Sequence, residues 1–406
     1  MSILRLVGKL FISQRRQTAG FLAVLTLVSS IAFSFITLLN NKSLVFNGTV
    51  TDERYFVLFG SVTVLCCLLG SFYLFQLALN MNRKHLSVIM LAGATDRQLK
   101  QLVVTEVTVL YVASSVLAIL ISALSYPVFF RFLTGMIKAQ WEINPVDAHA
   151  ILISLMITSA SLVLTIIKGI SEFETKPADY LNIKEPFSGV LRKKGKPLLL
   201  LMALLVLIGG ALLCRFLAEE NNFWKYLLAV VPVICSTVYL TGHIFTVISP
   251  KCVEDHLSLP LATYQMRKSR FPIMVFSFAI EVYVYSINSL SPFNKEIYSV
   301  FHILNVAAMV LTLSERQLID QSDKSRQLAQ MLYLGLTESQ IYKACNCEMI
   351  LYYAGLLLTF LLPLFLGGAS LLVVLCSGLI ISIGFVFCLY SYRHTVRERV
   401  GKIRNE

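Results

Sequence analysis

Three carboxylates stand inside long apolar runs, where a charged side chain is costly. They are Glu106, Glu281 and Glu348. At bilayer depth such a group faces the interior of a helix bundle, a water-filled cavity or a partner. Glu281 lies in the run FPIMVFSFAIEVYVYSINSL. If this run spans the membrane, Glu281 is either part of a substrate pathway or hydrogen-bonded to a Tyr or Ser of a neighbouring helix. The third alternative is that the run does not span the membrane. The nearby candidates are Tyr283, Tyr285 and Ser286.

Glu106 and Glu348 occupy equivalent positions in a repeated pattern. Leu86–Tyr111 aligns without a gap with Leu328–Tyr353, 242 residues later, and six positions are identical. The identical pairs are Leu86/Leu328, Gly93/Gly335, Thr95/Thr337, Gln98/Gln340, Glu106/Glu348 and Tyr111/Tyr353. Such a match indicates an internal duplication. Each glutamate then lies where a helix enters the bilayer, either as a hydrogen-bonded contact that transmits motion or as a carboxylate that reaches the membrane surface.

The repeated pattern predicts two helices joined by a short turn. In the first copy, the basic pair Arg83-Lys84 opens an amphipathic helical stretch, and the small residues Ala92, Gly93 and Ala94 interrupt it. Thr95 then offers its hydroxyl as the N-cap of a second helix that continues into an apolar run.

No motif for catalysis or metal binding appears. The three Gly-Lys pairs lack the glycine spacing and the following hydroxyl of a phosphate-binding loop. The six histidines show no zinc-binding spacing, and most of the nine cysteines lie in apolar runs. We therefore expect no catalytic residue, no metal and no cofactor on this chain.

Composition and charge define the elements that position these residues. Hydrophobic residues make up 56% and charged residues 14% of the chain, which is typical of a polytopic membrane protein. Ten apolar runs reach the length of about 20 residues that a spanning helix needs. They predict an all-α protein with ten transmembrane helices in a 4+2+4 arrangement. With the N-terminus in the cytoplasm, the cytoplasmic segments hold 28 of the 35 Lys and Arg residues, as the positive-inside rule requires. Both termini and both turns are then cytoplasmic.

The predicted organisation has six segments. In chain order they are an interfacial amphipathic helix (1–19), a first four-helix unit (20–168) with an amphipathic helix at 83–97, a cytoplasmic linker (169–197), a central helix pair (198–249), a second four-helix unit (250–392) with an amphipathic helix at 325–339, and a basic cytoplasmic tail (393–406).

The turn motifs LAGAT and LGLT, each followed by Gln and by a glutamate at the next apolar run, resemble the coupling region of FtsX/MacB-like permeases. Those are the membrane subunits of ABC transporters and mechanotransmitters. The resemblance implies two FtsX-like four-helix repeats whose coupling helices, 83–97 and 325–339, dock on a cytosolic ABC ATPase dimer that binds ATP and Mg²⁺. The alternative is a pair of helices that lie on the inner leaflet. The residues implied at the ATPase contact are Arg83, Lys84, Leu91, Gly93, Ala94, Thr95, Arg97, Arg326, Leu334, Gly335, Leu336 and Thr337.

The ten-helix order is similar to the bacitracin-resistance (BceB-like) branch of these permeases. That branch carries a large external domain between helices seven and eight, where this chain has only Asn288–Lys295. The resemblance implies ATP-driven export or removal of an amphipathic peptide or lipid-linked molecule at a bacterial cell membrane, in antimicrobial peptide resistance or bacteriocin export. The alternative is a sensor that controls a histidine kinase or a cell-wall hydrolase without transport. Either role admits an external accessory protein as a further partner, and neither involves nucleic acid.

Overall fold

The computed structural model describes residues 7, 15–39, 50–91, 93–137, 148–172, 197–219, 223–243, 253–289, 295–333 and 337–405. Regular structure in these ranges is helical, and no strand occurs in them. The prediction of an all-α protein is confirmed for this part of the chain.

The chain divides into two compact units, Met1–Lys184 and Glu185–Glu406. Unit 1 holds α2 (Arg15–Leu39), α4 (Val50–Leu91), α5 (Asp96–Ile137) and α6 (Ala148–Glu172). Unit 2 holds α9 (Pro197–Glu219), α10 (Phe223–His243), α11 (Val253–Lys268), α12 (Arg270–Ser289), α13 (Lys295–Tyr333), α14 (Glu338–Leu366) and α15 (Leu371–Asn405). The boundary between the units falls inside the 169–197 connector.

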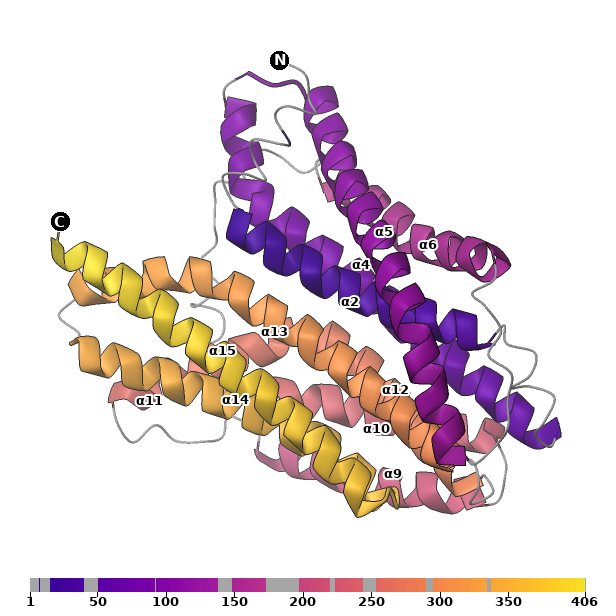
Figure 1. Ribbon diagram of the computed structural model, residues 1–406. Coiled ribbons are helices and arrows are strands. Elements are labelled where there is room, and N and C mark those ends of the chain that lie inside the picture. Colours follow the sequence, from indigo (N-terminus) through magenta and orange to yellow (C-terminus); the bar gives the residue numbers. More distant parts are fainter. Residues whose placement is uncertain are drawn as a thin grey trace. The chain divides into compact units, whose positions relative to one another are not determined.

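In unit 1, α2 lies against α4, α5 and α6 (Figure 1). The rings of Phe21 and Phe75 join α2 to α4, with centroids 6.4 Å apart. The Ser122 hydroxyl of α5 donates to the Ser30 carbonyl of α2 at 2.8 Å. Small hydroxyl residues at such crossings allow close approach and supply hydrogen bonds where water is absent.

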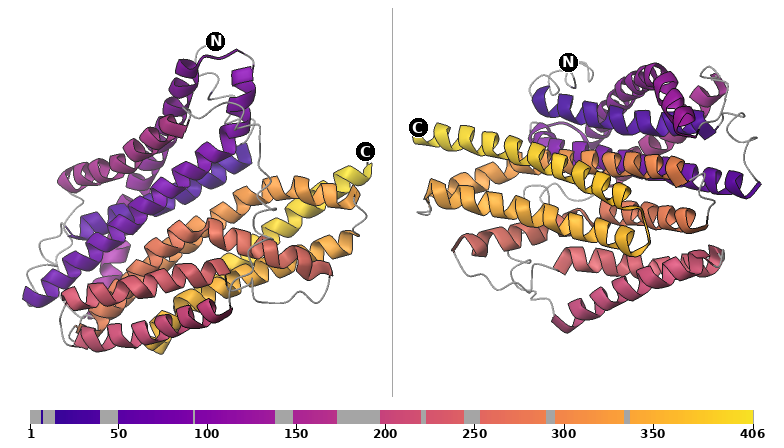
Figure 2. Two further views of the ribbon diagram at one scale, coloured as in Figure 1. Left: turned by 180° about the vertical axis from the view of Figure 1, so that it is seen from behind. Right: turned by 60° about the horizontal axis from the view of Figure 1, so that its bottom comes forward.

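In unit 2, α13 packs against α12 and α15, and α14 packs against α11 and α15 (Figure 2). The central pair α9 and α10 also belongs to this unit, because both helices contact α12. Gly384 of α15 allows α13 and α15 to approach closely, since an added Cβ would meet Val310 Cγ1 at 2.3 Å.

Eight helices of the described residues are long and apolar enough to cross a membrane, which supports a multi-pass membrane protein. The eight segments are Thr18–Leu39, Gly60–Leu79, Asp96–Val128, Ala148–Ile170, Arg270–Asn288, Tyr298–Leu318, Glu338–Leu366 and Leu371–His394. In the central pair the apolar stretches found among the described residues are shorter, Leu201–Cys214 and Leu228–Leu240. The ten-helix 4+2+4 arrangement therefore stays a prediction.

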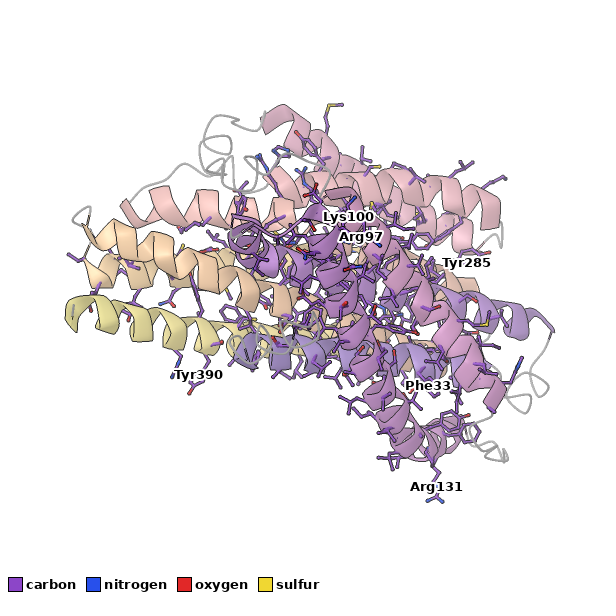
Figure 3. All side chains as sticks on the ribbon, turned by 90° about the horizontal axis from the view of Figure 1, so that it is seen from above. Phe33, Arg97, Lys100, Arg131, Tyr285 and Tyr390 are labelled. Atoms are coloured by element: carbon purple, nitrogen blue, oxygen red, sulfur yellow. The ribbon has the colours of Figure 1, made fainter. Side chains whose placement is uncertain are left out.

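The outer helices of the units expose apolar side chains that suit contact with lipid. Only 24% of the apolar window of α6 and 28% of that of α15 are buried, against 72% for α4 and 78% for α12. Met156 of α6 and Tyr390 of α15 are largely exposed, and Tyr390 projects outward from its helix (Figure 3). The buried helices α4 and α12 thus form the inner part of their units.

Five predicted segments differ from the structure or lie mostly outside the described residues. Residues 83–97 are not one helix: 83–91 continue α4, a turn follows, and α5 begins at Asp96. Likewise 325–333 continue α13, and α14 begins at Glu338. The predicted tail continues α15 as helix through Asn405. Most of the interfacial helix 1–19 and of the linker 169–197 lies outside the described residues.

Candidate functional site

The first turn ends α4 through a glycine-dependent motif. Gly93 has a φ of +95°, a left-handed conformation that glycine adopts at little cost. The Ala94 amide donates to the Ile89 carbonyl at 3.2 Å, which is the 6→1 bond of a Schellman motif with glycine at C′. The repeated glycine is therefore explained in the first copy by helix termination. Its counterpart Gly335, with Leu334 and Leu336, lies outside the described residues.

The second helix of each turn starts with the same capping box. The Thr95 hydroxyl accepts from the Gln98 amide at 3.4 Å, and the Gln98 side chain accepts from the Thr95 amide at 3.0 Å. Thr337 and Gln340 form the same two bonds at 3.3 and 3.0 Å. The predicted N-cap role of Thr95 is confirmed, and both repeated pairs have one physical cause, the need to satisfy the first amides of a helix.

Replacing Thr95 with alanine should loosen the first turn of α5, because loss of a threonine cap costs about 1 kcal/mol. We expect roughly fivefold faster amide hydrogen exchange over residues 96–99 in Thr95→Ala. Thr337→Ala should act equally on α14. Thr105→Ala is the matched control, since Thr105 only bonds back to the Gln101 carbonyl of its own helix, at 2.7 Å. Unchanged exchange in both cap variants would contradict the assignment.

The other predicted docking residues lie on both sides of these turns. Arg83, Lys84 and Leu91 belong to the last turns of α4, and Arg326 to the end of α13. Arg97 is exposed on the first turn of α5 (Figure 3). It lines a surface hollow of about 760 Å³ together with Asp96, Lys100, Gln101, Val104 and Thr105. The exposed start of α5 therefore presents mixed charge next to the capped turn.

The repeated glutamates are both buried inside their own unit. Glu106 is 1% and Glu348 0% exposed, so neither carboxylate reaches outward to the protein surface. The Glu348 carboxylate interacts electrostatically with Tyr392 of α15. A movement of α14 would therefore change the contact between Glu348 and α15.

The repeated tyrosine joins α5 to α6 in unit 1 and α14 to α15 in unit 2. The Tyr111 hydroxyl of α5 donates to the Leu155 carbonyl of α6 at 3.1 Å. The Tyr353 hydroxyl of α14 donates to the Gly384 carbonyl of α15 at 3.4 Å and lies 3.2 Å from the Ser314 hydroxyl of α13. The repeat therefore preserves an interhelical contact as well as a turn.

Glu281 is 2% exposed, and its partner comes from the central pair. The Tyr226 hydroxyl of α10 donates to the Glu281 backbone carbonyl and lies 3.4 Å from Glu281 Oε2. The rings of Tyr226 and Tyr285 lie 4.5 Å apart. This arrangement corresponds to the hydrogen-bonded alternative among those stated for Glu281.

The nearby candidates proposed from sequence are not hydrogen-bond partners of the Glu281 carboxylate. Tyr283 instead contacts the Ser299 hydroxyl, at 3.1 Å, and stacks on His302. Ser286 donates to the Val282 carbonyl of its own helix. Local spacing could not identify Tyr226, which lies 55 residues away.

Sequence reasoning also missed Arg316, a buried arginine that joins three helices. Its side chain is 1% exposed, and Nη1 of α13 donates to the Lys268 carbonyl at the end of α11. Arg316 interacts electrostatically with Tyr352 of α14, whose hydroxyl lies 3.0 Å from the Ser269 hydroxyl between α11 and α12. A cation at the carbonyl end of a helix is favourable. In the sequence, the only indication of this role was the position of Arg316 at the edge of an apolar run.

Beside this junction, His243 joins the end of α10 to α11. Its Nδ1 lies 3.2 Å from Arg267 Nη2, so Nδ1 must accept from the guanidinium. Burial, and then Arg267 and Arg270, lower the pKa of His243 below its usual value of 6.5. The unfolded chain therefore binds a proton at pH values where the folded chain does not, and stability falls as pH drops below about 6.5.

We expect the thermal unfolding midpoint to decrease less between pH 7 and pH 5 in His243→Gln than in the wild type. Glutamine can still accept from Arg267 but does not titrate. His394→Gln, at an exposed position of α15, is the control and should keep the wild-type slope. Identical slopes for all three proteins would rule out the His243 contribution.

Residues 57–173 match the family model described as FtsX-like permease C-terminal. This range includes most of α4, the first turn, α5 with Glu106, and α6. A comparison with curated proteins found no match. The family match and the apolar helices support an FtsX/MacB-like ABC permease, a multi-pass membrane component of an ABC-type transporter or FtsX-like system. FtsX-like permeases are membrane subunits that generally partner with ABC ATPases.

Proposed function

We propose that this chain is the permease subunit of an ABC transporter, in which a separate cytosolic ATPase dimer drives export or removal of an amphipathic peptide or lipid-linked substrate. The proposal rests chiefly on the duplicated turn with its identical capping boxes. Two copies of one docking element suit a partner that is itself a dimer. The antimicrobial peptide or bacteriocin role and the BceB-like assignment belong to this proposal.

The long helices explain how such docking would move the membrane part. α4 has 42 residues and α13 has 39, and neither breaks between its apolar segment and the turn. From Leu79 to Leu91, α4 extends about 18 Å beyond its apolar segment, at 1.5 Å per residue. A push at the turn would therefore be transmitted along a continuous helix. Glu106 and Glu348 are buried about three turns into the helices that follow the two turns, α5 and α14, and would carry the movement into the unit.

The proposed substrate class follows from the surface of the units. The predicted external loops are short, which leaves lateral entry from the bilayer or delivery by an accessory protein. The exposed apolar faces of α6 and α15 suit contact with acyl chains or amphipathic peptides. The chain is proposed to lie in a bacterial plasma membrane with both termini in the cytoplasm.

Site-specific photocrosslinking tests the docking step. A photoreactive amino acid at Arg97 should crosslink to the ATPase in membranes. The same amino acid at Arg131 should not, because these exposed positions lie near opposite ends of α5 (Figure 3), roughly 50 Å apart along the helix. Crosslinks at Arg131 but not at Arg97 would refute docking at the turns.

The purified complex should contain one copy of this chain per ATPase dimer, because the duplication supplies both docking turns. A complex of two chains and two ATPases would contradict this. Candidate peptides should stimulate ATP hydrolysis and be moved between leaflets or across proteoliposomes. Stimulation without movement would favour the sensor that acts on a histidine kinase or a cell-wall hydrolase.

A further inference from the structure

The junction of α10, α11 and α12 gathers cationic side chains at the edge of an apolar helix. The helical bonds continue through it, since the Ser269 amide donates to Gln265 and the Ile273 amide to Ser269. Arg267 and Arg270 are therefore three residues apart on one helical path and share a face. His243, held by Arg267 at 3.2 Å, adjoins the same face from α10.

The charges at this junction do not balance around Arg270. Within the described part of the chain, the charged groups that interact with it are His243 and Arg267. The Arg270 Nε atom is buried and donates no hydrogen bond among those residues. The two guanidinium groups repel each other, because each carries a positive charge on the same helical face. An anion beside Arg270 would offset this repulsion and accept a hydrogen bond from its Nε atom.

The surroundings place this cationic corner at the depth of lipid headgroups. Arg270 is the first residue of the apolar segment that ends at Asn288. Tyr239 lies against His243, with ring centroids 4.7 Å apart, and the Lys268 ammonium lies 5.4 Å from the Tyr264 ring. Tyrosine and basic residues gather in this way at membrane–water interfaces, where the phosphates of anionic lipids lie.

We propose that the cationic corner of Arg267, Arg270 and His243 is a binding site for the phosphate of an anionic phospholipid headgroup. Arg267 and Arg270 donate to the phosphate oxygens, and His243 orients Arg267. The acyl chains of the lipid extend along the exposed apolar side chains in the first turns of α12, a helix that is otherwise buried. Occupancy of the site stabilises the α11–α12 junction, which Arg316 and Tyr352 also contact. This site is independent of ATPase docking and of the transported substrate.

Binding of short-chain phosphatidylglycerol, measured by native mass spectrometry in detergent, tests the proposal. We compare the wild type, Arg267→Gln/Arg270→Gln and the control Lys343→Gln/Arg393→Gln, which removes two exposed cations of α14 and α15. The wild type and the control should bind phosphatidylglycerol with equal affinity, and the Arg267/Arg270 variant at least about tenfold more weakly, because bonds to charged groups are lost. Phosphatidylcholine and inorganic phosphate are titrated in parallel.

Equal phosphatidylglycerol affinity in all three proteins would overturn the site. Binding of inorganic phosphate as tight as that of phosphatidylglycerol would assign the site to free phosphate, and equal binding of phosphatidylcholine would exclude selection of anionic headgroups. Should the Arg267/Arg270 variant fail to fold, a photoactivatable phosphatidylglycerol applied to the wild type decides the matter. Labelling within residues 264–274 supports the proposal, and labelling only elsewhere refutes it.

Discussion

Replacing Arg316 with leucine should lower the free energy of unfolding by about 2–4 kcal/mol, the largest stability effect that we expect from a single substitution in unit 2. The side chain is buried, donates to the Lys268 carbonyl and faces the Tyr352 phenol. Leucine fills part of the volume but leaves the end of α11 without its cationic donor. Denaturant unfolding in mixed micelles, followed by circular dichroism, measures the change.

Two further variants isolate the reason for this loss. Arg316→Lys keeps the charge but loses the planar fork of donors, so we expect an intermediate loss. Arg393→Leu removes an exposed arginine that bonds to the Asn346 side chain at 3.1 Å, and should cost less than about 0.5 kcal/mol. If Arg316→Leu is no more destabilising than Arg393→Leu, the junction does not depend on the buried guanidinium.

Replacing Gly93 with valine should weaken ATPase binding and coupled ATP hydrolysis roughly five- to thirtyfold. A residue with a Cβ pays about 1–2 kcal/mol in a left-handed conformation, so the turn leaves its native form. An added Cβ would meet nothing within 4 Å, and the effect therefore comes from the backbone alone. Titration of the ATPase onto the reconstituted chain, with ATP hydrolysis measured in parallel, checks both quantities.

The matched control for Gly93 is asparagine, which tolerates the left-handed region. Gly93→Asn should therefore bind the ATPase nearly as the wild type does, although it is polar and has a comparable volume. If the valine and asparagine variants behave alike, the conformation of the turn does not matter for docking. Faster amide exchange around residues 93–95 in Gly93→Val would show separately that the turn itself had changed.

Patterns of local origin could be recognised in the sequence alone. Apolar length predicts the helices, because a chain in lipid must satisfy its backbone bonds internally. The position of Thr95 before the second helix predicts its N-cap role, because capping involves residues only a few positions apart. The part of Gln98 in the capping box was found in the structure. The small residues Ala92, Gly93 and Ala94 predict an interruption between the two helices, whereas the left-handed conformation of Gly93 was found only in the structure. The helix boundaries differ from the prediction. Most of each predicted coupling helix is the end of α4 or α13, because nothing in the sequence stops the preceding helix before the turn.

Contacts between distant segments were decided only by the tertiary structure. The partner of Glu281 proved to be Tyr226 of α10 rather than a nearby residue of α12. Arg316 reaches the Lys268 carbonyl across 48 residues, and Tyr111 reaches α6 across 44. The helical periodicity of a sequence indicates which side chains share a face of a helix. It does not indicate which other helix packs against that face. The choice of partner depends on packing of whole helices, and for that reason the sequence determined the helices and the turns while the fold determined which buried polar groups meet.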